Sequence, residues 1–200
     1  MLRFFKIAFL VSVAVYIATL IYYNIPRRLC VVPDGTVRLI QTGDIIMSEG
    51  FSLKSDAVRL LSGVGAVHQF SHCGIARVEG DSTYVVHMST DSSRIVSEEI
   101  HRFVVQNTSL GIGVYRLREP FPLPSLCRQL DSLQAIPMPF DPMFHMQSEN
   151  SYYCTELVVK VFSHIGCPAF QSLLHEDRVT PSELILTGKL KEVAYVGNDD

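Results

Sequence analysis

The longest apolar stretch of the chain lies close to its first residue. Between Ile7 and Tyr23 there is no charged side chain, and Ser12 and Thr19 are the only polar residues besides tyrosine. With the apolar residues that flank it, this run approaches the roughly 20 residues that a membrane-crossing helix needs. Tyrosines near its end are typical of residues at a membrane surface. The pattern therefore predicts one N-terminal transmembrane helix.

The alternative to an anchor is a cleavable signal peptide. Cleavage needs small residues at the end of the apolar run, and no Ala, Ser or Gly occurs between Ala18 and Gly35. We therefore expect an uncleaved single-pass membrane anchor over residues 1–28, a linker over 29–36 and one domain over 37–200. Basic residues nearly balance on the two sides of the run, so they determine its orientation only weakly. We expect the domain to lie outside the cytoplasm, on the periplasmic side if the protein is bacterial.

Beyond the linker, strand-like and helix-like patterns follow one another. Thr180-Pro181-Ser182-Glu183 has the form of a capping box that opens a short helix. Ser125 is a candidate cap for a helix that buries apolar residues as far as Ile136. The pattern over 94–104 is mixed and fits either a strand or a helix. The other expected strands cover 37–40, 45–47, 72–78, 81–89, 111–117 and 190–196, and the other expected helices cover 55–61 and 154–165.

The clearest hairpin joins the strand-like runs 72–78 and 81–89. If Glu79-Gly80 forms the centre of a tight turn, counting back along both strands places His72 opposite His87. Side chains paired in this way lie on one face, with Cβ atoms about 5 Å apart. A slip of one residue would send the two imidazoles to opposite faces of the sheet.

A second candidate for chemistry is Cys154, which follows Tyr152 and Tyr153 and opens an apolar helical pattern that stops at Gly166. In the first turn of a helix, free backbone N–H groups and the helix dipole favour a thiolate over a thiol. A thiolate in this position is suited to attack on a carbonyl carbon. The alternative is a small buried thiol that only packs.

Composition narrows the classes of function. The net charge of -3 gives no sign of a nucleic-acid partner. The cysteine count is odd and no C-x-x-C spacing occurs, so neither a disulfide framework nor a zinc ribbon is indicated. A zinc site from His68, His72 and Cys73 is a weaker alternative, because strand alternation points His72 and Cys73 to opposite faces. We expect no metal and no other cofactor. The pairing of Cys30, Cys73, Cys127 and Cys167 stays open.

A cysteine nucleophile needs a base, and the base needs a group that orients it. His72 is the natural base for Cys154, and His87, placed beside it by the hairpin, would hold its ring. Glu156 is a poorer orienting group, because it lies about 200° around the helix from Cys154. The backbone N–H of Cys154 would help to form an oxyanion hole, and Tyr152 or Tyr153 either assists it or simply packs.

Taken in order, several segments resemble the circularly permuted papain-like amidases, the YiiX/YaeF-like branch of the NlpC-type cysteine peptidase superfamily. They are Gly43-Asp44-Ile45-Ile46, residues 70–75, Val85-Val86-His87, Phe140-Asp141 and residues 152–157. Histidine precedes cysteine here, which is the order of the permuted enzymes. The resemblance covers roughly residues 37–196. It implies an α+β fold in which an antiparallel sheet packs on helices, with Cys154 as nucleophile and His72 as base. The third position, often Glu in this branch, is His87 here.

The resemblance implies cleavage or transfer of acyl groups at amide or ester bonds. We therefore expect a membrane-anchored cysteine hydrolase that acts through a Cys154–His72–His87 triad and a thioester. Its substrate would be a peptide, a cell-wall compound or a lipid-derived acyl compound. The alternatives are an acyltransferase on lipid substrates and an inactive peptide- or lipid-binding module on the same fold. The oligomeric state is not determined by the sequence.

Overall fold

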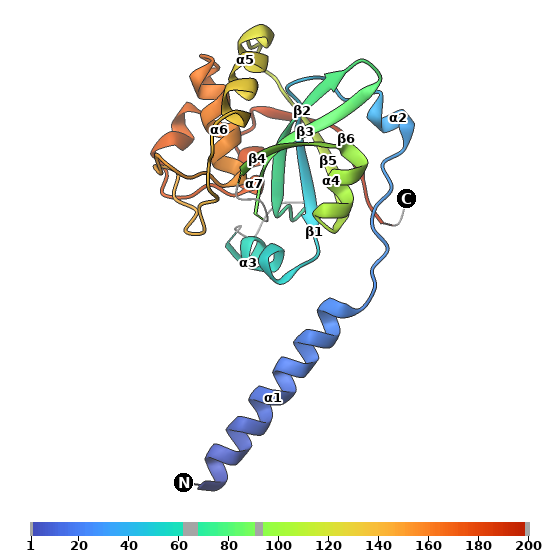
Figure 1. Ribbon diagram of the computed structural model, residues 1–200, viewed down its shortest axis with the longest axis vertical. Coiled ribbons are helices and arrows are strands. Elements are labelled where there is room, and N and C mark those ends of the chain that lie inside the picture. Colours follow the sequence, from blue (N-terminus) through green and yellow to red (C-terminus); the bar gives the residue numbers. More distant parts are fainter. Residues whose placement is uncertain (1, 62–67, 91–93, 199–200) are drawn as a thin grey trace.

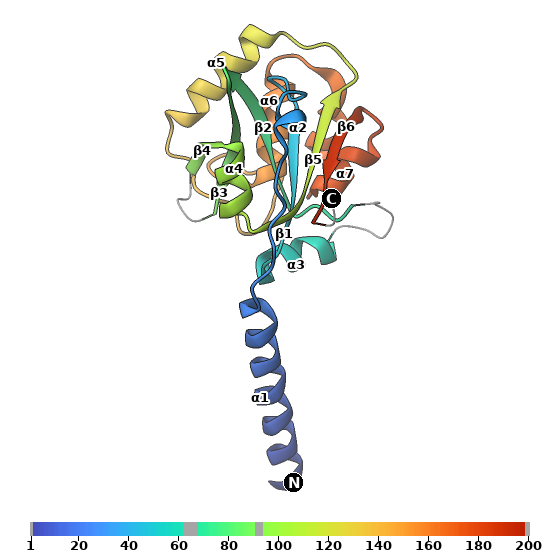
Figure 2. The ribbon, with the colours of Figure 1, turned by 90° about the vertical axis from the view of Figure 1, so that its right-hand side faces the viewer.

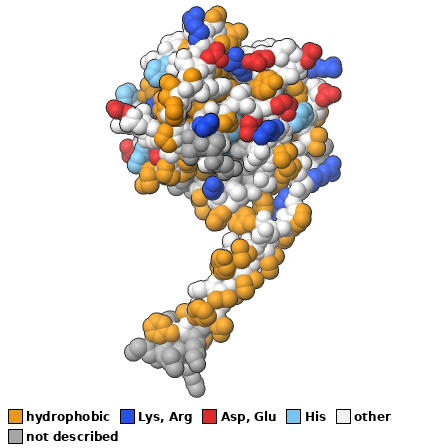
Figure 3. All heavy atoms as spheres, viewed as in Figure 1, with side chains coloured by type: hydrophobic (Ala, Val, Ile, Leu, Met, Phe, Trp, Pro, Cys, Tyr) orange, Lys and Arg blue, Asp and Glu red, His pale blue; other side chains and the backbone are white. Residues whose placement is uncertain are grey.

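The computed structural model describes residues 2–61, 68–90 and 94–198. A long helix, α1 (Leu2–Asn24), projects from a domain built around a β-sheet (Figure 1). Most of its apolar side chains are exposed and cover its surface (Figure 3). The segment Ile7–Asn24 has a mean hydropathy of 1.8, and none of it is buried. The helix is long and apolar enough to cross a membrane, as a signal sequence would also be.

In the described part of the chain, six antiparallel strands form one sheet in the order β4-β3-β2-β1-β5-β6. Helices α5 and α6 lie on one side of this sheet, and α2 and α4 lie on the other (Figures 1 and 2). This arrangement confirms the α+β class and the antiparallel sheet. The strands are β1 Ile45–Gly50, β2 His72–Glu79, β3 Ser82–Ser89, β4 Arg94–Glu99, β5 Ser109–Leu117 and β6 Leu190–Val196. The helices of the domain are α2 Asp34–Val37, α3 Leu53–Leu61, α4 Ile100–Gln106, α5 Leu123–Gln134, α6 Cys154–His164, the 3₁₀ helix η1 Pro168–His175 and α7 Pro181–Leu186.

Two hydrophobic clusters hold these layers together. The larger one joins one face of the sheet to α5, α6 and η1, and its β2 residues are Cys73 and Ile75. The smaller one joins the opposite face to α4, and its β2 residue is Ala76. Neighbouring residues of β2 thus point to opposite faces, as strand alternation requires.

Helix α6 begins at Cys154, as the sequence predicts. The carboxylate of Glu156 accepts the backbone N–H of Tyr153 (3.2 Å), which satisfies one of the free donors at the helix start. The helix ends before Gly166, whose φ of +80° suits a glycine at this position. The position of Cys154 is therefore fixed by local sequence at both ends of its helix.

The predicted register of the β2–β3 hairpin is wrong by two residues. Val78 lies opposite Thr83, and the turn is centred on Gly80 and Asp81 rather than on Glu79 and Gly80. Gly80 has a φ of +58°, as the first central residue of a two-residue hairpin turn requires. A shift of two residues preserves the alternation of faces, so His72 and His87 remain on the same side.

Two other expectations need correction, and one segment that the sequence left open is decided. Val37 ends the short helix α2 and does not begin a strand. Helix α5 starts at Leu123, before Ser125, because Pro124 fits the first turn of a helix, and Ile136 beyond its end is 50% exposed. The ambiguous segment 94–104 holds both the strand β4 and the start of α4.

Several expected elements are confirmed. Strand β6 has the predicted bounds, and the capping box at Thr180 opens α7. Helix α3 begins two residues earlier than expected.

The segment between α1 and α2 packs on the domain. Cys30 and Val32 are buried in the smaller hydrophobic cluster, and the Cys30 N–H donates to the Ser109 carbonyl (3.0 Å). Burial raises the pKa of the Cys30 thiol to about 11. Cys30 is therefore a core residue of the domain.

Candidate active site

His72 and His87 meet at one end of the β2–β3 hairpin. The Nε2 of His72 lies 2.9 Å from the Nδ1 of His87, a hydrogen-bonding distance. The ladder between the two strands ends at the pair Ile75–Val86, short of both histidines. Both rings pack on Phe103 of α4, with ring centroids 5.8 Å and 4.9 Å away. The structure thus brings together the two histidines that the sequence singled out, although they are not a directly opposed pair.

Gly74 makes room for this pair. A Cβ atom added at Gly74 would lie 2.8 Å from the Cβ of His87 and 2.6 Å from the side chain of Val85. Such distances are well below van der Waals contact. Absence of a side chain at Gly74 therefore lets His87 lie against β2 and reach His72.

Beyond His87 lies a carboxylate that the sequence did not reveal. Glu98 of β4 has its Oε2 3.3 Å from the Nε2 of His87. Both atoms are buried, and neither meets the geometric criteria of a hydrogen bond with any described residue, so the two are an electrostatic pair at 3.3 Å. The close approach of His87 lowers the pKa of Glu98 despite its partial burial. Burial lowers the pKa of His87, which favours a neutral ring.

The charge of Glu98 favours one tautomer for each ring. A charged Glu98 favours the proton of a neutral His87 on Nε2, which leaves Nδ1 as an acceptor. The Nε2–H of His72 then donates to that acceptor. The Nδ1 of His72 remains available to exchange a proton with another group.

The thiol of Cys154, which is 5% exposed at the start of α6, is influenced by this ring. A hydrogen bond with the Cys73 thiol, together with the charge of the His72 ring and a hydrogen bond with it, lowers the pKa of Cys154 well below its usual value. Burial acts in the opposite direction. The start of a helix adds to the stabilisation of a thiolate.

Cys73 is the neighbour that the sequence assigned only to the core. It is fully buried, as predicted, and it points from β2 towards the start of α6. Its sulfur and that of Cys154 each lie 3.8 Å from the hydroxyl oxygen of Thr155. Burial, and then the contact with Cys154, raise the pKa of Cys73, so this thiol stays protonated and can donate to a Cys154 thiolate.

The residues that flank Cys154 in the sequence contribute to packing and to the start of the helix. The hydroxyl of Tyr153 accepts the N–H of Val179 (2.9 Å), and the ring of Tyr152 lies 4.5 Å from the Lys160 ammonium. Glu156 is fully buried and 2.7 Å from Lys160. Burial raises its pKa to about 7 although Lys160 opposes the change. Both tyrosines pack, and Glu156 stabilises the helix start.

A small pocket surrounds Cys154. Its volume of about 10 Å³ is close to the least that one water molecule occupies. It is lined by Val58, Phe144, Tyr153, Cys154, Thr155, Arg178, Val179, Thr180 and Pro181. The thiol is therefore nearly closed off, and Val58 of α3 forms part of the cover.

Four further histidines have no contact with the Cys154 site in the described structure. The ring of His68 stacks on Tyr195 (centroids 3.7 Å apart), and its Nδ1 lies 3.5 Å from Glu49. His145, His164 and His175 are exposed. Over residues 2–61, 68–90 and 94–198, no three His, Cys, Asp or Glu side chains are grouped to hold a metal ion, so we assign no metal site there.

Comparison with known families identifies the family of the domain. A family of permuted papain-like amidase enzymes, YaeF/YiiX, C92 family, matches residues 39–193. The chain belongs to this family. Members of the C92 family are amidases, so the chain is in general terms a cysteine hydrolase of amide bonds.

The fold of the C92 domain also has a solved counterpart. The crystal structure described as metalloprotein yiiX from Escherichia coli O157:H7 matches with a TM-score of 0.60 and 20% sequence identity. The match covers 77% of this chain and 96% of that chain, which supports the fold of nearly the whole domain. No curated protein sequence matches the chain significantly.

Proposed function

We propose that the protein is a membrane-anchored cysteine amidase in which Cys154 is the nucleophile, His72 the general base and acid, and His87 the residue that orients His72. Glu98 completes the row by fixing the tautomer of His87. The observation that carries this proposal is the row His72–His87–Glu98, in which the ring nitrogens lie 2.9 Å apart and the Glu98 oxygen lies 3.3 Å from His87. At the other end of the row, the His72 ring lowers the pKa of the Cys154 thiol. The anchor is α1, whose exposed apolar surface matches the interior of a bilayer.

In the first half of the reaction, the Cys154 thiolate attacks the carbonyl carbon of the substrate, and the C=O electron pair moves onto oxygen. Protonated His72 then gives its Nδ1 proton to the leaving nitrogen as the C–N bond breaks. The products are an amine and a thioester on Cys154. The developing oxyanion would be stabilised by the backbone N–H of Cys154, because the first N–H groups of a helix have no partner within it.

In the second half, His72 takes a proton from water, and the oxygen of that water attacks the thioester carbon. The C–S bond breaks, an acid is released, and the thiolate and the protonated imidazole are restored. His87 keeps the His72 ring in one orientation through both halves. Because the Nε2–H of His72 is held by His87, the proton exchanged with substrate is always the one on Nδ1.

The test is the rate at which iodoacetamide modifies Cys154 near neutral pH, read by mass spectrometry of the Cys154 peptide. We expect fast modification of the full chain in detergent and much slower modification of His72→Ala. His145→Ala is the matched control, because His145 is exposed and outside the site. An acyl probe should then form a thioester on Cys154 in the full chain.

Slow modification of Cys154 that is unchanged in His72→Ala would refute the catalytic role and indicate a binding module on the same fold. Formation of the thioester with His72→Ala at the full rate would show that another group is the base.

A further inference from the structure

Helix α3 exposes an apolar stripe to solvent. Leu53, Ala57 and Leu60 recur at the i, i+4 and i+7 positions of one helical face. All three are exposed, and Leu60 is 87% exposed. Leucines exposed along one face of a short, strongly amphipathic helix are typical of an element that rests on a membrane or on another protein.

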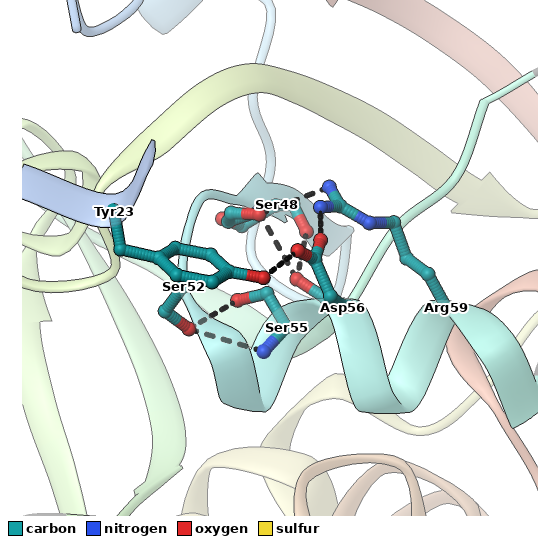
Figure 4. Close-up of polar contacts among 8 residues, drawn as sticks. Tyr23, Ser48, Ser52, Ser55, Asp56 and Arg59 are labelled. Carbon is teal, nitrogen blue, oxygen red and sulfur yellow. Dashed lines mark hydrogen bonds and ion pairs between the residues drawn. The ribbon is translucent and has the colours of Figure 1, made fainter. Parts of the chain in front are cut away.

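The position of α3 next to α1 favours the membrane over another protein as the surface on which α3 rests. The Tyr23 hydroxyl at the end of α1 donates to the Asp56 carboxylate of α3, and Asp56 also pairs with Arg59 (Figure 4). The guanidinium of Arg59 in turn donates to the Gly50 carbonyl (3.0 Å). A helix fixed in this way to the end of an anchor lies where the surface of the bilayer would be.

Aromatic and basic residues at this junction fit the same surface. The rings of Tyr22 and Tyr23 lie 5.3 Å and 5.5 Å from the ring of Phe51, which precedes α3. The Arg27 guanidinium lies over the Phe51 ring at 4.7 Å. Lys54 of α3 is exposed beside the leucines. Aromatic rings belong at the level of lipid headgroups, and cations there attract anionic lipids.

The same helix covers the thiol on its other side. Val58 lines the closed pocket at Cys154, whereas Ala57 and Leu60 face solvent. Helix α3 therefore lies between the expected bilayer surface and the nucleophile. Movement of this helix would open the pocket on the side that faces the membrane.

A groove between α1 and the start of α3 is a candidate site for a lipid-like molecule. It has a volume of about 760 Å³ and is mostly apolar. Its walls are Ser52 and Leu53, at the start of α3, and one face of α1 from Val11 to Tyr23. A volume of this size is in the range that accommodates a small ligand or an acyl chain.

We propose that the stripe Leu53–Ala57–Leu60 docks on the lipid bilayer and that α3 is a lid through which an acyl substrate held in the membrane reaches Cys154. The substrate class is then an amide that carries a lipid acyl chain. This inference rests on the proposed membrane-anchored amidase and adds the direction from which its substrate arrives.

The chain has no tryptophan, so a single introduced tryptophan is a clean reporter. Leu60→Trp is compared with Leu123→Trp, in the full chain reconstituted in vesicles of phosphatidylcholine and phosphatidylglycerol. Leu123 is an exposed leucine at the start of α5, and α5 lies away from α1 (Figures 1 and 2). We expect blue-shifted emission and quenching by brominated lipid at position 60, and neither at position 123. Unquenched emission at position 60, or equal quenching at both positions, would overturn the docking.

The lid is tested by modification of Cys154 with a chloroacetamide that carries an octyl chain. In vesicles, Leu60→Asp should slow this reaction several-fold relative to the unmodified chain, because a carboxylate opposes insertion of α3. An unchanged rate would overturn the lid. In detergent, the unmodified chain and His72→Ala have the same cover over Cys154, so the ratio of their iodoacetamide rates reports on the nucleophile and its base. Equal rates would concern the proposed amidase and not the docking of α3.

Discussion

The Nε2 atom of His72 lies 2.9 Å from the Nδ1 atom of His87. Two neutral imidazoles can hydrogen-bond only if one presents a proton and the other a lone pair. Glu98 lies 3.3 Å from the other ring nitrogen of His87 and favours a proton there. His87 is then the acceptor and His72 the donor of the hydrogen bond between the rings. The reactivity of Cys154 should therefore depend on a carboxylate that is not in contact with it.

Glu98→Gln should lower the rate of amide hydrolysis and of Cys154 modification by about ten- to a hundredfold, because the tautomer of His87 is no longer fixed. The nitrogen-15 chemical shifts of the two imidazoles should show a change in which ring nitrogen of His87 carries the proton. Glu79→Gln, an exposed glutamate on the same hairpin, is the control. Unchanged imidazole shifts in Glu98→Gln would disprove the assignment of Glu98.

Cys73→Ala should raise the pKa of Cys154, because the thiolate loses the hydrogen bond from its buried neighbour. Hydrogen bonds to charged groups contribute about 1.5–3 kcal/mol, so the pH profile of iodoacetamide modification should move up by about one pH unit or more. Cys167→Ala removes another buried thiol from the same hydrophobic cluster and should leave the profile in place. Equal profiles for the two variants would exclude a role for Cys73.

Gly74→Ala should displace His87, since the new methyl group would lie 2.8 Å from the His87 Cβ. Overpacking of this kind costs about 1–3 kcal/mol, and the loss should appear in thermal unfolding in detergent together with slower modification of Cys154. Gly35→Ala is the matched control, because a Cβ there meets nothing within 4 Å. A stable and fully reactive Gly74→Ala protein would show that the site tolerates a wider separation of the strands.

Glu156→Gln should change how stability depends on pH. Burial raises the pKa of Glu156 to about 7, from 4.5 when exposed, so the folded state favours the protonated form. The associated stability is present below pH 4.5 and is lost as the pH rises through 7. Each pKa unit corresponds to about 1.4 kcal/mol, so raising the pH from 4 to 8 should destabilise the unmodified protein relative to Glu156→Gln by up to about 3 kcal/mol. Parallel stability curves for the two proteins would contradict this.

How far the sequence predicted this site depends on the range of each interaction. The start of α6 at Cys154 follows from local periodicity and helix-end chemistry, and the structure has it there. The faces of His72 and His87 follow from strand alternation, which an error of two residues in register does not disturb. The expected direct pairing failed because the turn begins one residue later, at Gly80.

The residues that the sequence did not reveal depend on packing between distant elements. Glu98 lies in a segment whose pattern fits both helix and strand, and its contact with His87 requires the pairing of β3 with β4. The contact of Cys73 with Cys154 depends on how α6 sits on β2. A glutamate in the segment after the hairpin was the available signal, but no spacing rule connects it to His87.

The short path from α1 to the domain limits where the enzyme can act. Only residues 25–29 separate the end of α1 from Cys30, whose N–H is already bonded to the sheet. Five extended residues span at most about 18 Å. With α1 in a bilayer, this short linker keeps the domain close to the lipid surface and out of reach of anything far from it. Its substrates would have to come to the membrane, and the local concentration there, not diffusion through the surrounding compartment, would set its rate.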